Sequence, residues 1–504
     1  MRTKLSVYNT SSAMLLQMVN LITTLILPGV IINEYGSAVN GLVSSIRQFI
    51  SYFNLVEAGL AGAAVYALYK PLAEKDTDRT NRVLSAANRF YNISGFIFAA
   101  FVLLSTFIYP LFVSGQGVSR MTIALLVVII GISGALEFFA MGKYRVLFTA
   151  DQKSYVIAII NAITIAFNSL IIFVLAKLHF DIVIVQLFAV TGFLARSALF
   201  TLYARRKYSA LSFKAPPDNK ALDKRWDSLI LQVLGVVTTG TPIIVTTFFS
   251  GLREVSVFVI FNMVFASVTA LLTTFNNGLA ATFGDLLIRK EMGIFQRAYI
   301  QYEYLYYGLL GWGYACAAIL IMPFIKIYTA SFTDANYIRP EIAVLFVLSG
   351  LLYNVKTPHG MLVISAGLYK ETKYQTLAQA IINIVVSVAL APFFGMAGVL
   401  VGSIVSNLYR DVDLIFYIPK VVTGLPPVLT IKRVIRMLVL TAVSIAPIFG
   451  LVRMNPSGYV SWLFWAILTA LWCFIVFAAG NTIMERDTAR QVLERFGSLL
   501  KKSR

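Results

Sequence analysis

Long apolar stretches recur along almost the whole chain, and no other feature constrains the fold as strongly. A helix needs about 20 mostly apolar residues to cross the hydrocarbon core of a bilayer. About fourteen such stretches lie near residues 10–32, 38–66, 90–113, 121–142, 154–176, 182–204, 229–250, 255–288, 299–328, 341–366, 375–394, 397–418, 435–452 and 459–480. Most connections between them are short, so neighbouring helices are expected to run antiparallel. The sequence therefore predicts an all-α, polytopic membrane protein.

The composition excludes most soluble classes of protein. Hydrophobic residues make up 58% of the 504 residues and charged residues only 13%, whereas a soluble domain averages about half apolar and about a quarter charged. A water-soluble enzyme is therefore excluded. The net charge of +19 would indicate nucleic-acid binding in a soluble protein, so its meaning here depends on where the basic residues lie.

The basic residues are distributed unequally between the two sides of the membrane. If the N-terminus is cytoplasmic, the cytoplasmic segments hold about 33 of the 42 Lys and Arg residues and the outer segments about six, as the positive-inside rule requires. An even number of helices then returns the C-terminus to the cytoplasm. Topology and contact with an anionic inner leaflet explain most of the charge, and we expect no nucleic-acid partner.

Two halves of the chain resemble each other. Gly134–Ala150 can be laid without gaps on Gly350–Ala366, and Ile159–Asn161 matches Ile381–Asn383 at a similar offset. In transporters built from parallel repeats, the substrate path is expected between the two lobes. The predicted divisions are an N-lobe at 1–207, a cytoplasmic linker at 208–228, a C-lobe at 229–420, an extra helix pair at 421–480 and a basic amphipathic cytoplasmic tail at 481–504. The tail is interpreted either as an interfacial helix or as a frayed charged terminus.

Three cations fall well inside predicted helices: Arg47, Arg196 and Lys356. A charged residue at mid-bilayer costs about 2.5–3.5 kcal/mol on insertion scales, so it usually faces a cavity or a partner. One interpretation is that each cation pairs with a carboxylate and locks two helices together. Three cations in different helices of both halves favour a shared basic cavity that attracts a phosphate or pyrophosphate headgroup. Pro358, just after Lys356, is expected to kink its helix.

Other polar residues accompany these cations. Asn54 and Glu57 share one side of the second helix with Arg47, Glu137 lies in the inner half of the fourth helix, and Asn354 precedes Lys356 by two positions. Glu57 and Glu137 are candidates for binding H⁺ or Na⁺, because burial favours the protonated form of a carboxyl group. The alternative is that both form salt bridges to Arg47 or another basic group.

The remaining chemistry-bearing residues indicate neither a metal centre nor an enzyme. The two cysteines and two histidines lack metal-ligand spacing, and no Walker A sequence, Gly-Xaa-Ser-Xaa-Gly elbow or paired His/Glu motif occurs. The outer loops are too short for the catalytic loop of a membrane polymerase or acyltransferase. A cluster of aromatic residues opens the ninth helix; it is interpreted as an interfacial belt in preference to a sugar-stacking surface and comprises Tyr302, Tyr304, Tyr306, Tyr307 and Trp312.

Several segments resemble those of a known transporter family. In the first half they are Tyr35-Gly36, Gly41-Leu42-Val43 and Glu57-Ala58-Gly59-Leu60. In the second half they are Ala366–Thr372, Ile382-Asn383 and Gly395–Ser403. Together they resemble the polysaccharide-transporter, or oligosaccharide-flippase, family of the multidrug/oligosaccharidyl-lipid/polysaccharide (MOP) exporter superfamily, and the likeness runs over nearly the whole chain.

The resemblance implies two pseudo-symmetric six-helix lobes around a central cavity that work by alternating access. Such family members move undecaprenyl-diphosphate-linked oligosaccharides across the bacterial inner membrane for O-antigen, capsule or exopolysaccharide assembly. Arg47, Arg196 and Lys356 match the residue types expected to meet the diphosphate. Polysaccharide assembly proteins are then expected partners, and an H⁺ or Na⁺ gradient replaces any organic cofactor. The extra helix pair also fits members that flip the peptidoglycan precursor lipid II, and a multidrug/cation antiporter of the same superfamily is a further alternative.

Overall fold

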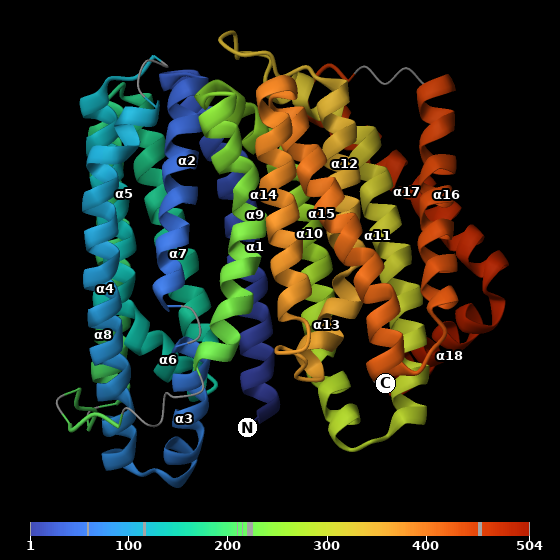
Figure 1. Ribbon diagram of the computed structural model, residues 1–504, viewed down its shortest axis with the longest axis horizontal. Helices are drawn as coiled ribbons and strands as arrows, with labels where there is room; N and C mark the ends of the chain where they lie inside the picture. The colour runs from blue at the N-terminus through green and yellow to red at the C-terminus, as the bar shows by residue number, and fades with distance from the viewer. Residues whose placement is uncertain are drawn as a thin grey trace. The chain divides into compact units, whose positions relative to one another are not determined.

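The computed structural model describes residues 2–57, 60–113, 117–208, 210–213, 215–218, 225–451 and 456–502. Helices with short connections make up these residues, and none of them lies in a strand (Figure 1). Ten helices in the described part of the chain are long and apolar enough to cross a membrane. The predicted all-α, polytopic architecture is confirmed.

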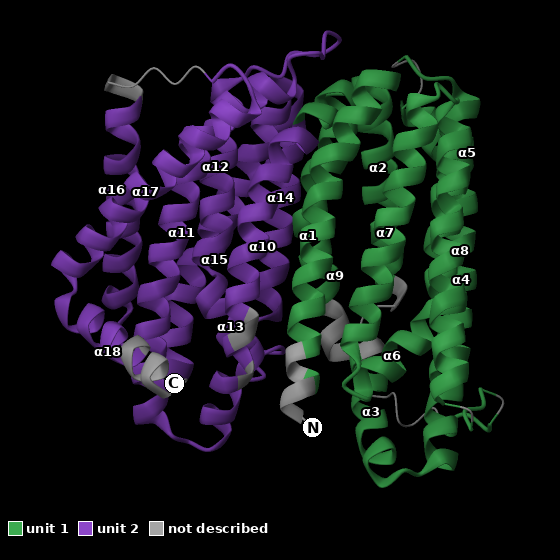
Figure 2. Ribbon diagram, turned by 180° about the vertical axis from the view of Figure 1, so that it is seen from behind, with its two compact units in different colours: residues 1–257 green, residues 258–504 purple. Residues whose placement is uncertain are grey.

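By the packing of its helices the chain forms two compact units, Met1–Val257 and Phe258–Arg504 (Figure 2). Long helices alternate with shorter pieces in the first unit. Its elements are α1 (Arg2–Tyr35), α2 (Ser37–Phe53), the 3-10 turn η1 (Asn54–Glu57), α3 (Leu60–Glu74), α4 (Thr77–Val113), α5 (Arg120–Leu136), the π-helical turn η2 (Glu137–Met141), α6 (Gly142–Ala150), α7 (Ser154–Lys177), α8 (Ile182–Lys207) and α9 (Arg225–Phe249).

The second unit begins inside α10 (Leu252–Ile288). Its further elements are α11 (Met292–Tyr328), α12 (Pro340–Val355), α13 (Thr357–Ser365), α14 (Lys373–Phe394), α15 (Met396–Ile418), η4 (Pro419–Thr423), α16 (Pro427–Leu451), α17 (Tyr459–Met484) and α18 (Arg486–Lys502). The helix α18 forms where the spacing of apolar residues in the tail indicated one, and its Ala489 and Val492 pack against Tyr304 of α11.

The order and lengths of the elements repeat between the two halves of the sequence. α4 and α11 each contain 37 residues, and α6 and α13 each contain nine. The helix before α6 is interrupted by the π-helical turn η2, and the helix before α13 is interrupted at Lys356. These interruptions fall in the two segments that align best in the sequence.

The interruption at Lys356 follows from the proline two residues later. Pro358 has no N–H to donate to the carbonyl of Asn354, so the helical ladder is broken there. The hydroxyl of Tyr306 donates to that carbonyl at 3.1 Å, and the hydroxyl of Tyr307 donates to the carbonyl of Val355 at 3.0 Å. The helix is thus broken at Lys356, and two buried tyrosines of α11 satisfy the backbone around the break.

The packing boundary and the repeat boundary do not coincide. The predicted second half starts at 229, within α9, whereas packing assigns the whole of α9 to the first unit. The reason is close contact with α2: Ser45 and Thr247 share a hydrogen bond of 2.6 Å. Asn40 also donates to Ser256 at 2.8 Å, just after the start of α10.

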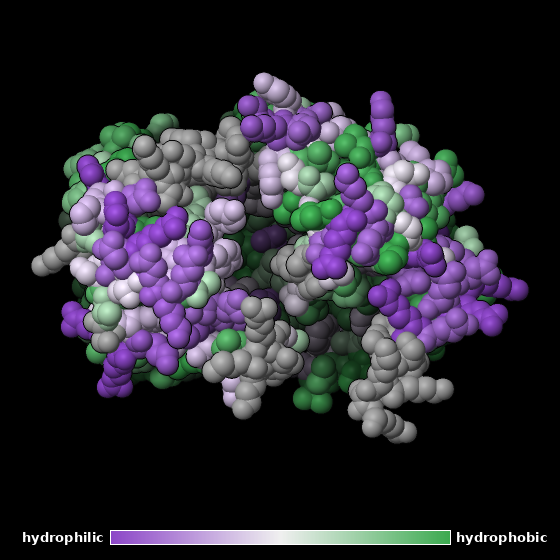
Figure 3. Space-filling view, turned by 90° about the horizontal axis from the view of Figure 1, so that it is seen from below, coloured by the Kyte–Doolittle hydropathy of each residue, from purple (hydrophilic) through white to green (hydrophobic). Residues whose placement is uncertain are grey.

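The long helices expose large apolar side chains on their outer faces. On α4, Phe96 and Phe107 are 69% and 74% exposed, while Phe98 is fully buried in the core of the unit. Large apolar side chains gathered on a water-exposed surface would make protein molecules associate. In a bilayer the same side chains contact lipid chains instead. At the end of the first unit where the chain turns from α3 into α4, hydrophilic side chains gather instead (Figure 3).

Candidate binding cavity in the first unit

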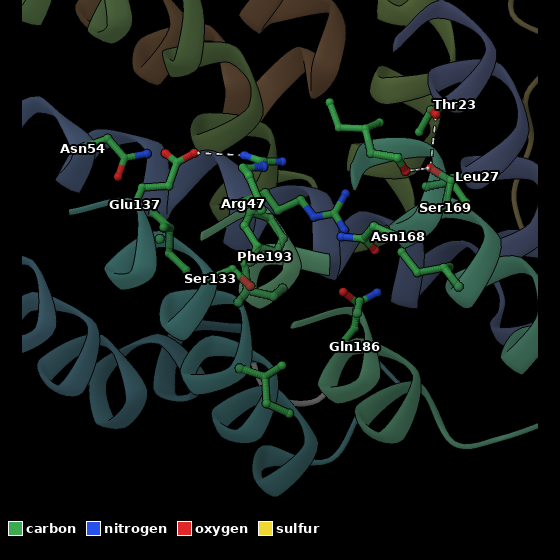
Figure 4. Close-up of a pocket in the computed structure, with 18 residues that line it drawn as sticks. Thr23, Leu27, Arg47, Asn54, Ser133, Glu137, Asn168, Ser169, Gln186 and Phe193 are labelled. Carbon is green, nitrogen blue, oxygen red and sulfur yellow. Dashed lines mark hydrogen bonds and ion pairs between the residues drawn. The ribbon is translucent and has the colours of Figure 1, made fainter. Parts of the chain in front are cut away.

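A cavity of about 330 Å³ lies within the first unit (Figure 4). Residues of α1, α2, η1, α5, η2, α7 and α8 line it. Most of its wall is apolar, including Leu27, Ile50 and Ile172, and polar side chains occur at a few points. Few polar groups placed in an apolar wall are typical of small-molecule sites, because they orient a ligand that the apolar surface encloses.

Four of the seven site residues predicted from the sequence line this cavity: Arg47, Asn54, Glu137 and Arg196. They come from four separate elements, α2, η1, η2 and α8. Glu57 ends η1, but its side chain lies outside the described residues. The other two, Asn354 and Lys356, belong to the second unit and are described below.

Arg196 has a carboxylate partner in the cavity. Its Nη1 lies 3.3 Å from Oε1 of Glu137, and its Nε donates to the hydroxyl of Thr164 at 3.2 Å. The guanidinium also lies 4.9 Å from the ring centre of Phe193. Glu137 is the first residue of the π-helical turn η2, a type of distortion that often occurs at functional sites. For these two residues, the salt bridge considered in the sequence analysis is formed.

Arg47 has no such partner. It is exposed to the cavity, although Ser45 and Ile46 beside it are buried. No hydrogen bond or ion pair involves its guanidinium within the described parts of the chain. The net charge of Arg47, Arg196 and Glu137 is therefore positive, and apolar walls strengthen the attraction of that charge for an anion.

Three amide side chains of the cavity have unused hydrogen-bonding atoms. Oδ1 of Asn54, Oδ1 of Asn168 and Nε2 of Gln186 are buried and have no hydrogen-bond partner in the described part of the chain. Buried polar atoms are nearly always paired, so three orphans around one cavity indicate a polar occupant. Together they offer two acceptors and one donor.

Sequence reasoning missed Asn168 and Gln186. Each is an isolated amide in an otherwise apolar helix, α7 and α8 respectively. An uncharged amide carries a smaller insertion cost than a charge, and it was therefore given no weight. The signal was nevertheless present, because Asn54 was selected on the same ground of being polar inside a helix.

Asn354 and Lys356 take part in contacts of the second unit. Asn354 is 1% exposed, and its amide nitrogen contacts Thr269 Oγ1 and Tyr314 OH, each at 3.0 Å. It therefore ties α12 to α10 and α11. Lys356 donates to Oδ1 of Asn407 and lies 4.8 Å from the ring centre of Tyr353.

The aromatic cluster of the ninth predicted helix is part of the protein core. Tyr302, Tyr306 and Tyr307 are at most 3% exposed, and they pack with one another and with Phe283 and Tyr299. The preference for an interfacial belt was wrong for these three residues. An aromatic residue near a helix end is as compatible with helix packing as with the interface, and composition does not show which way it faces.

No group of three or more His, Cys, Asp or Glu side chains that could hold a metal ion occurs among the described residues. No family model matches the sequence, and no curated protein matches it.

Solved structures match the chain over most of its length. An inward-facing multidrug resistance MATE family transporter of the MOP superfamily gives a TM-score of 0.61 at 13% identity, over 86% of this chain and 98% of that one. The MATE multidrug transporter DinF-BH gives 0.59 at 15% identity, over 84% and 97%. A MOP superfamily transporter from Pyrococcus furiosus, whose binding pocket is described as having reverse polarity, gives 0.54 at 12% identity, over 86% and 96%.

The protein is thus a multi-pass helical membrane protein. Its fold is that of transporters of the MOP superfamily, and more particularly it is similar to the MATE transporters among them. At these identities the likeness concerns the fold.

Proposed function

We propose that the protein is a flippase that moves undecaprenyl-diphosphate-linked oligosaccharide across the bacterial inner membrane by alternating access. The observation that carries the proposal is Arg47, a cation without a partner in a cavity of the first unit, as far as the described residues extend. An unpaired guanidinium surrounded by apolar walls favours an anionic occupant. The fold shared with transporters of the MOP superfamily supports movement of that occupant across the membrane.

The chemistry of the cavity fits a diphosphate and a sugar. The planar fork of an arginine suits phosphate oxygens, to which it donates two hydrogen bonds. The free acceptors of Asn54 and Asn168 and the free donor of Gln186 suit hydroxyl groups, which both donate and accept. A volume of about 330 Å³ accommodates part of a headgroup and not a long glycan, so the remaining sugars would extend beyond this cavity.

The main alternative is a multidrug/cation antiporter, since multidrug transporters share the fold. A cationic drug would be repelled by Arg47, whose charge no carboxylate neutralises in the described parts of the chain. Fold likeness extends to a relative described as having reverse polarity in its binding pocket, so the fold accommodates pockets of different charge. A lipid II flippase remains the alternative with the same headgroup chemistry.

The proposal also covers the orientation of the protein in the membrane, its partners and its energy source. Both termini are placed in the cytoplasm, the basic cytoplasmic segments contact an anionic inner leaflet, and polysaccharide assembly proteins receive the flipped lipid. An H⁺ or Na⁺ gradient is proposed as the energy source. The positive-inside distribution of Lys and Arg supports this orientation.

The test is flipping of a fluorescent undecaprenyl-diphosphate oligosaccharide by the purified protein in sealed vesicles. Arg47→Gln is expected to reduce flipping roughly tenfold or more, because hydrogen bonds to charged groups contribute about 1.5–3 kcal/mol. The matched control is Arg89→Gln, which changes an exposed arginine of α4 outside the cavity. Unchanged flipping in Arg47→Gln would show that Arg47 does not bind the headgroup. Export of a cationic dye by the wild type without flipping would replace the proposal with the antiporter. Flipping that continues after the ion gradients are dissipated would refute coupling.

A further inference from the structure

The second unit contains a buried carboxylate with no hydrogen bond. Asp411 of α15 is 3% exposed, and neither of its side-chain oxygens has a hydrogen-bond partner among the described residues. An ionised carboxylate in such a place is strongly disfavoured unless a cation or a proton accompanies it. Asp411 was not among the residues selected from the sequence.

A lysine lies beside this carboxylate but is directed elsewhere. Lys356, at the break between α12 and α13, interacts electrostatically with Asp411 through both its ammonium and its backbone N–H, yet no ion pair joins the two side chains. The ammonium instead donates to Oδ1 of Asn407, which also accepts from Nε2 of Gln379 at 3.1 Å. Asn407 and Asp411 are four residues apart on α15, so both lie on one face of that helix. The ammonium of Lys356 is thus held by Asn407, one helical turn along α15 from the carboxylate of Asp411, with which it forms no ion pair.

The other charged groups on helices around α15 have partners of their own, whereas Nδ1 of the titratable His359 has no hydrogen-bond partner among the described residues. Arg410 pairs with Asp413 and donates to Thr376 at 3.1 Å. On α16, Arg433 pairs with Glu303 of α11, and His359 of α13 lies 3.9 Å from the same carboxylate. The hydroxyls of Tyr306 and Tyr307 donate to backbone carbonyls, the ring of Tyr353 lies under the Lys356 ammonium, and α14 contributes the uncharged Gln379. Among the described residues around Asp411, Lys356 is therefore the cation available to neutralise it.

We propose that Asp411 and Lys356 form a proton-linked anion site: a proton on Asp411 frees Lys356 to bind an anion, and loss of that proton draws Lys356 to Asp411. The proton is taken from water onto a carboxylate oxygen and returned to water, and no other bond changes. The arrangement with Lys356 on Asn407 and no hydrogen bond to the oxygens of Asp411 among the described residues is the one expected for the protonated state. Lys356 as a whole residue is only partly buried.

The linkage follows from charge. With Asp411 protonated, the pair carries one positive charge and attracts an anion; with Asp411 ionised, the pair is neutral and Lys356 is engaged. Anion binding and proton binding must then favour each other by the same factor. This inference goes beyond the proposed function and rests on it only where the anion is identified with the diphosphate of the cargo.

The experiment uses the purified full-length protein and inorganic sulfate, which keeps its charge between pH 5 and 8. Sulfate affinity and proton uptake are measured by calorimetry in buffers of different ionisation enthalpy, for the wild type, Asp411→Asn, Lys356→Gln and the control Asp413→Asn. For one linked proton, the affinity of the wild type is expected to rise by about tenfold per unit fall in pH across the titration of Asp411. Asp411→Asn imitates the protonated state, so it should bind sulfate tightly at every pH without proton uptake.

Lys356→Gln should lose at least about tenfold in sulfate affinity together with the proton uptake, while Asp413→Asn should keep both. The infrared band of a protonated carboxyl group should be present in the wild type and in Asp413→Asn and absent in Asp411→Asn, which reports the proton even if binding is weak. A pH slope or carboxyl band that survives in Asp411→Asn, or sulfate binding indifferent to Lys356→Gln, would overturn the proposal. Sulfate binding is measured without the glycan cargo. The Asp411–Lys356 proposal can therefore be refuted while flipping still depends on Arg47, and the flipping proposal can be refuted while sulfate binding still depends on Lys356.

Discussion

The guanidinium of Arg433 and the carboxylate of Glu303 lie 2.8 Å apart, and each side chain is only 1% exposed. Thr430 donates to the same carboxylate at 2.7 Å, and Arg433 also pairs with Glu485. One arginine of α16 therefore joins α11 to the residue that precedes α18. Buried charges are tolerated when they are paired and hydrogen-bonded in this way.

Removal of one partner of this pair should destabilise the protein strongly. Glu303→Gln leaves the Arg433 charge buried with one carboxylate fewer, and breaking a buried pair typically costs about 3–5 kcal/mol. The measurement is thermal unfolding of the purified protein in detergent. The control is Glu494→Gln, which breaks the exposed pair of Glu494 with Arg490 and should cost at most about 0.5 kcal/mol. Equal thermal unfolding midpoints for Glu303→Gln and Glu494→Gln would contradict a stabilising role of the buried pair of Glu303 with Arg433.

Docking of α18 should depend on pH through Glu485. Burial alone would raise the pKa of this carboxyl, but the hydrogen bond and charge of Arg433, with Thr488 and Arg436, bring it below its ordinary value near 4.5. A lowered pKa in the docked state means that the stabilisation is complete above the ordinary value and is lost as the pH falls through the docked value.

Hydrogen–deuterium exchange of residues 486–495, corrected for the intrinsic rate, should therefore show protection at neutral pH and its loss below about pH 4.5. Glu485→Gln should show weak protection at every pH. If protection is independent of pH in the wild type, Glu485 does not hold α18.

A close approach of backbones in the first unit requires glycine at position 41. A Cβ added to Gly41 would lie 1.8 Å from the carbonyl oxygen of Leu252, whereas one added to Gly62 would meet nothing within 4 Å. Gly41→Ala should reduce stability by at least about 1–3 kcal/mol, the usual effect of overpacking. Gly62→Ala should be neutral or slightly stabilising, because alanine favours the helix by about 1 kcal/mol. Thermal unfolding of the two variants tests this contrast, and similar midpoints would refute it.

The sequence predicted the helices well and the site in part. Both predictions rest on hydropathy, which shows apolar helices and any charge that interrupts them. Arg47, Arg196 and Glu137 were selected because a charge in an apolar helix needs an explanation, and all three line one cavity. The same reasoning selected Lys356 but did not reveal that Asn407 would hold it. Such partners are set by helix packing, which brings together residues far apart in the chain.

The residues that were missed show what a single sequence lacks. Arg433 was not selected from the sequence, yet it is 1% exposed. Tyr306 and Tyr307 were assigned to an interfacial belt, yet they hold the backbone at the break near Lys356. Whether such a side chain faces the surface or the protein core depends on how deep the helix lies in the protein and how it is rotated about its axis. Composition encodes neither.

The two cysteines provide a test of the packing of α17 against α11. Cys316 of α11 and Cys473 of α17 are free thiols whose side chains are in contact. Oxidation with copper phenanthroline, followed by cleavage between the two helices, should leave the fragments joined until a reductant is added. Cys473→Ala should abolish the link. Fragments that separate without reduction would show that α17 does not pack on α11 in this way.

The pair between Arg196 and Glu137 should control how tightly the cavity holds an anion. The two side chains are 13% and 28% exposed and 3.3 Å apart, so the carboxylate competes with any anion for the guanidinium. Glu137→Gln releases Arg196 and should lower KM for a lipid-linked oligosaccharide by about threefold to tenfold, while slower release lowers kcat. Arg196→Gln should raise KM instead.

The exchanged variant, Arg196→Glu with Glu137→Arg, distinguishes this role from a purely structural one. If the pair only locks α8 to η2, both single variants should lose stability, the exchange should restore it, and KM should stay constant throughout. If Arg196 contacts the cargo, the exchange should restore stability but not KM, because the guanidinium then projects from η2 and no longer has Thr164 beside its Nε. Flipping rates measured over a range of cargo concentrations, together with thermal unfolding of the same four proteins, separate the two outcomes.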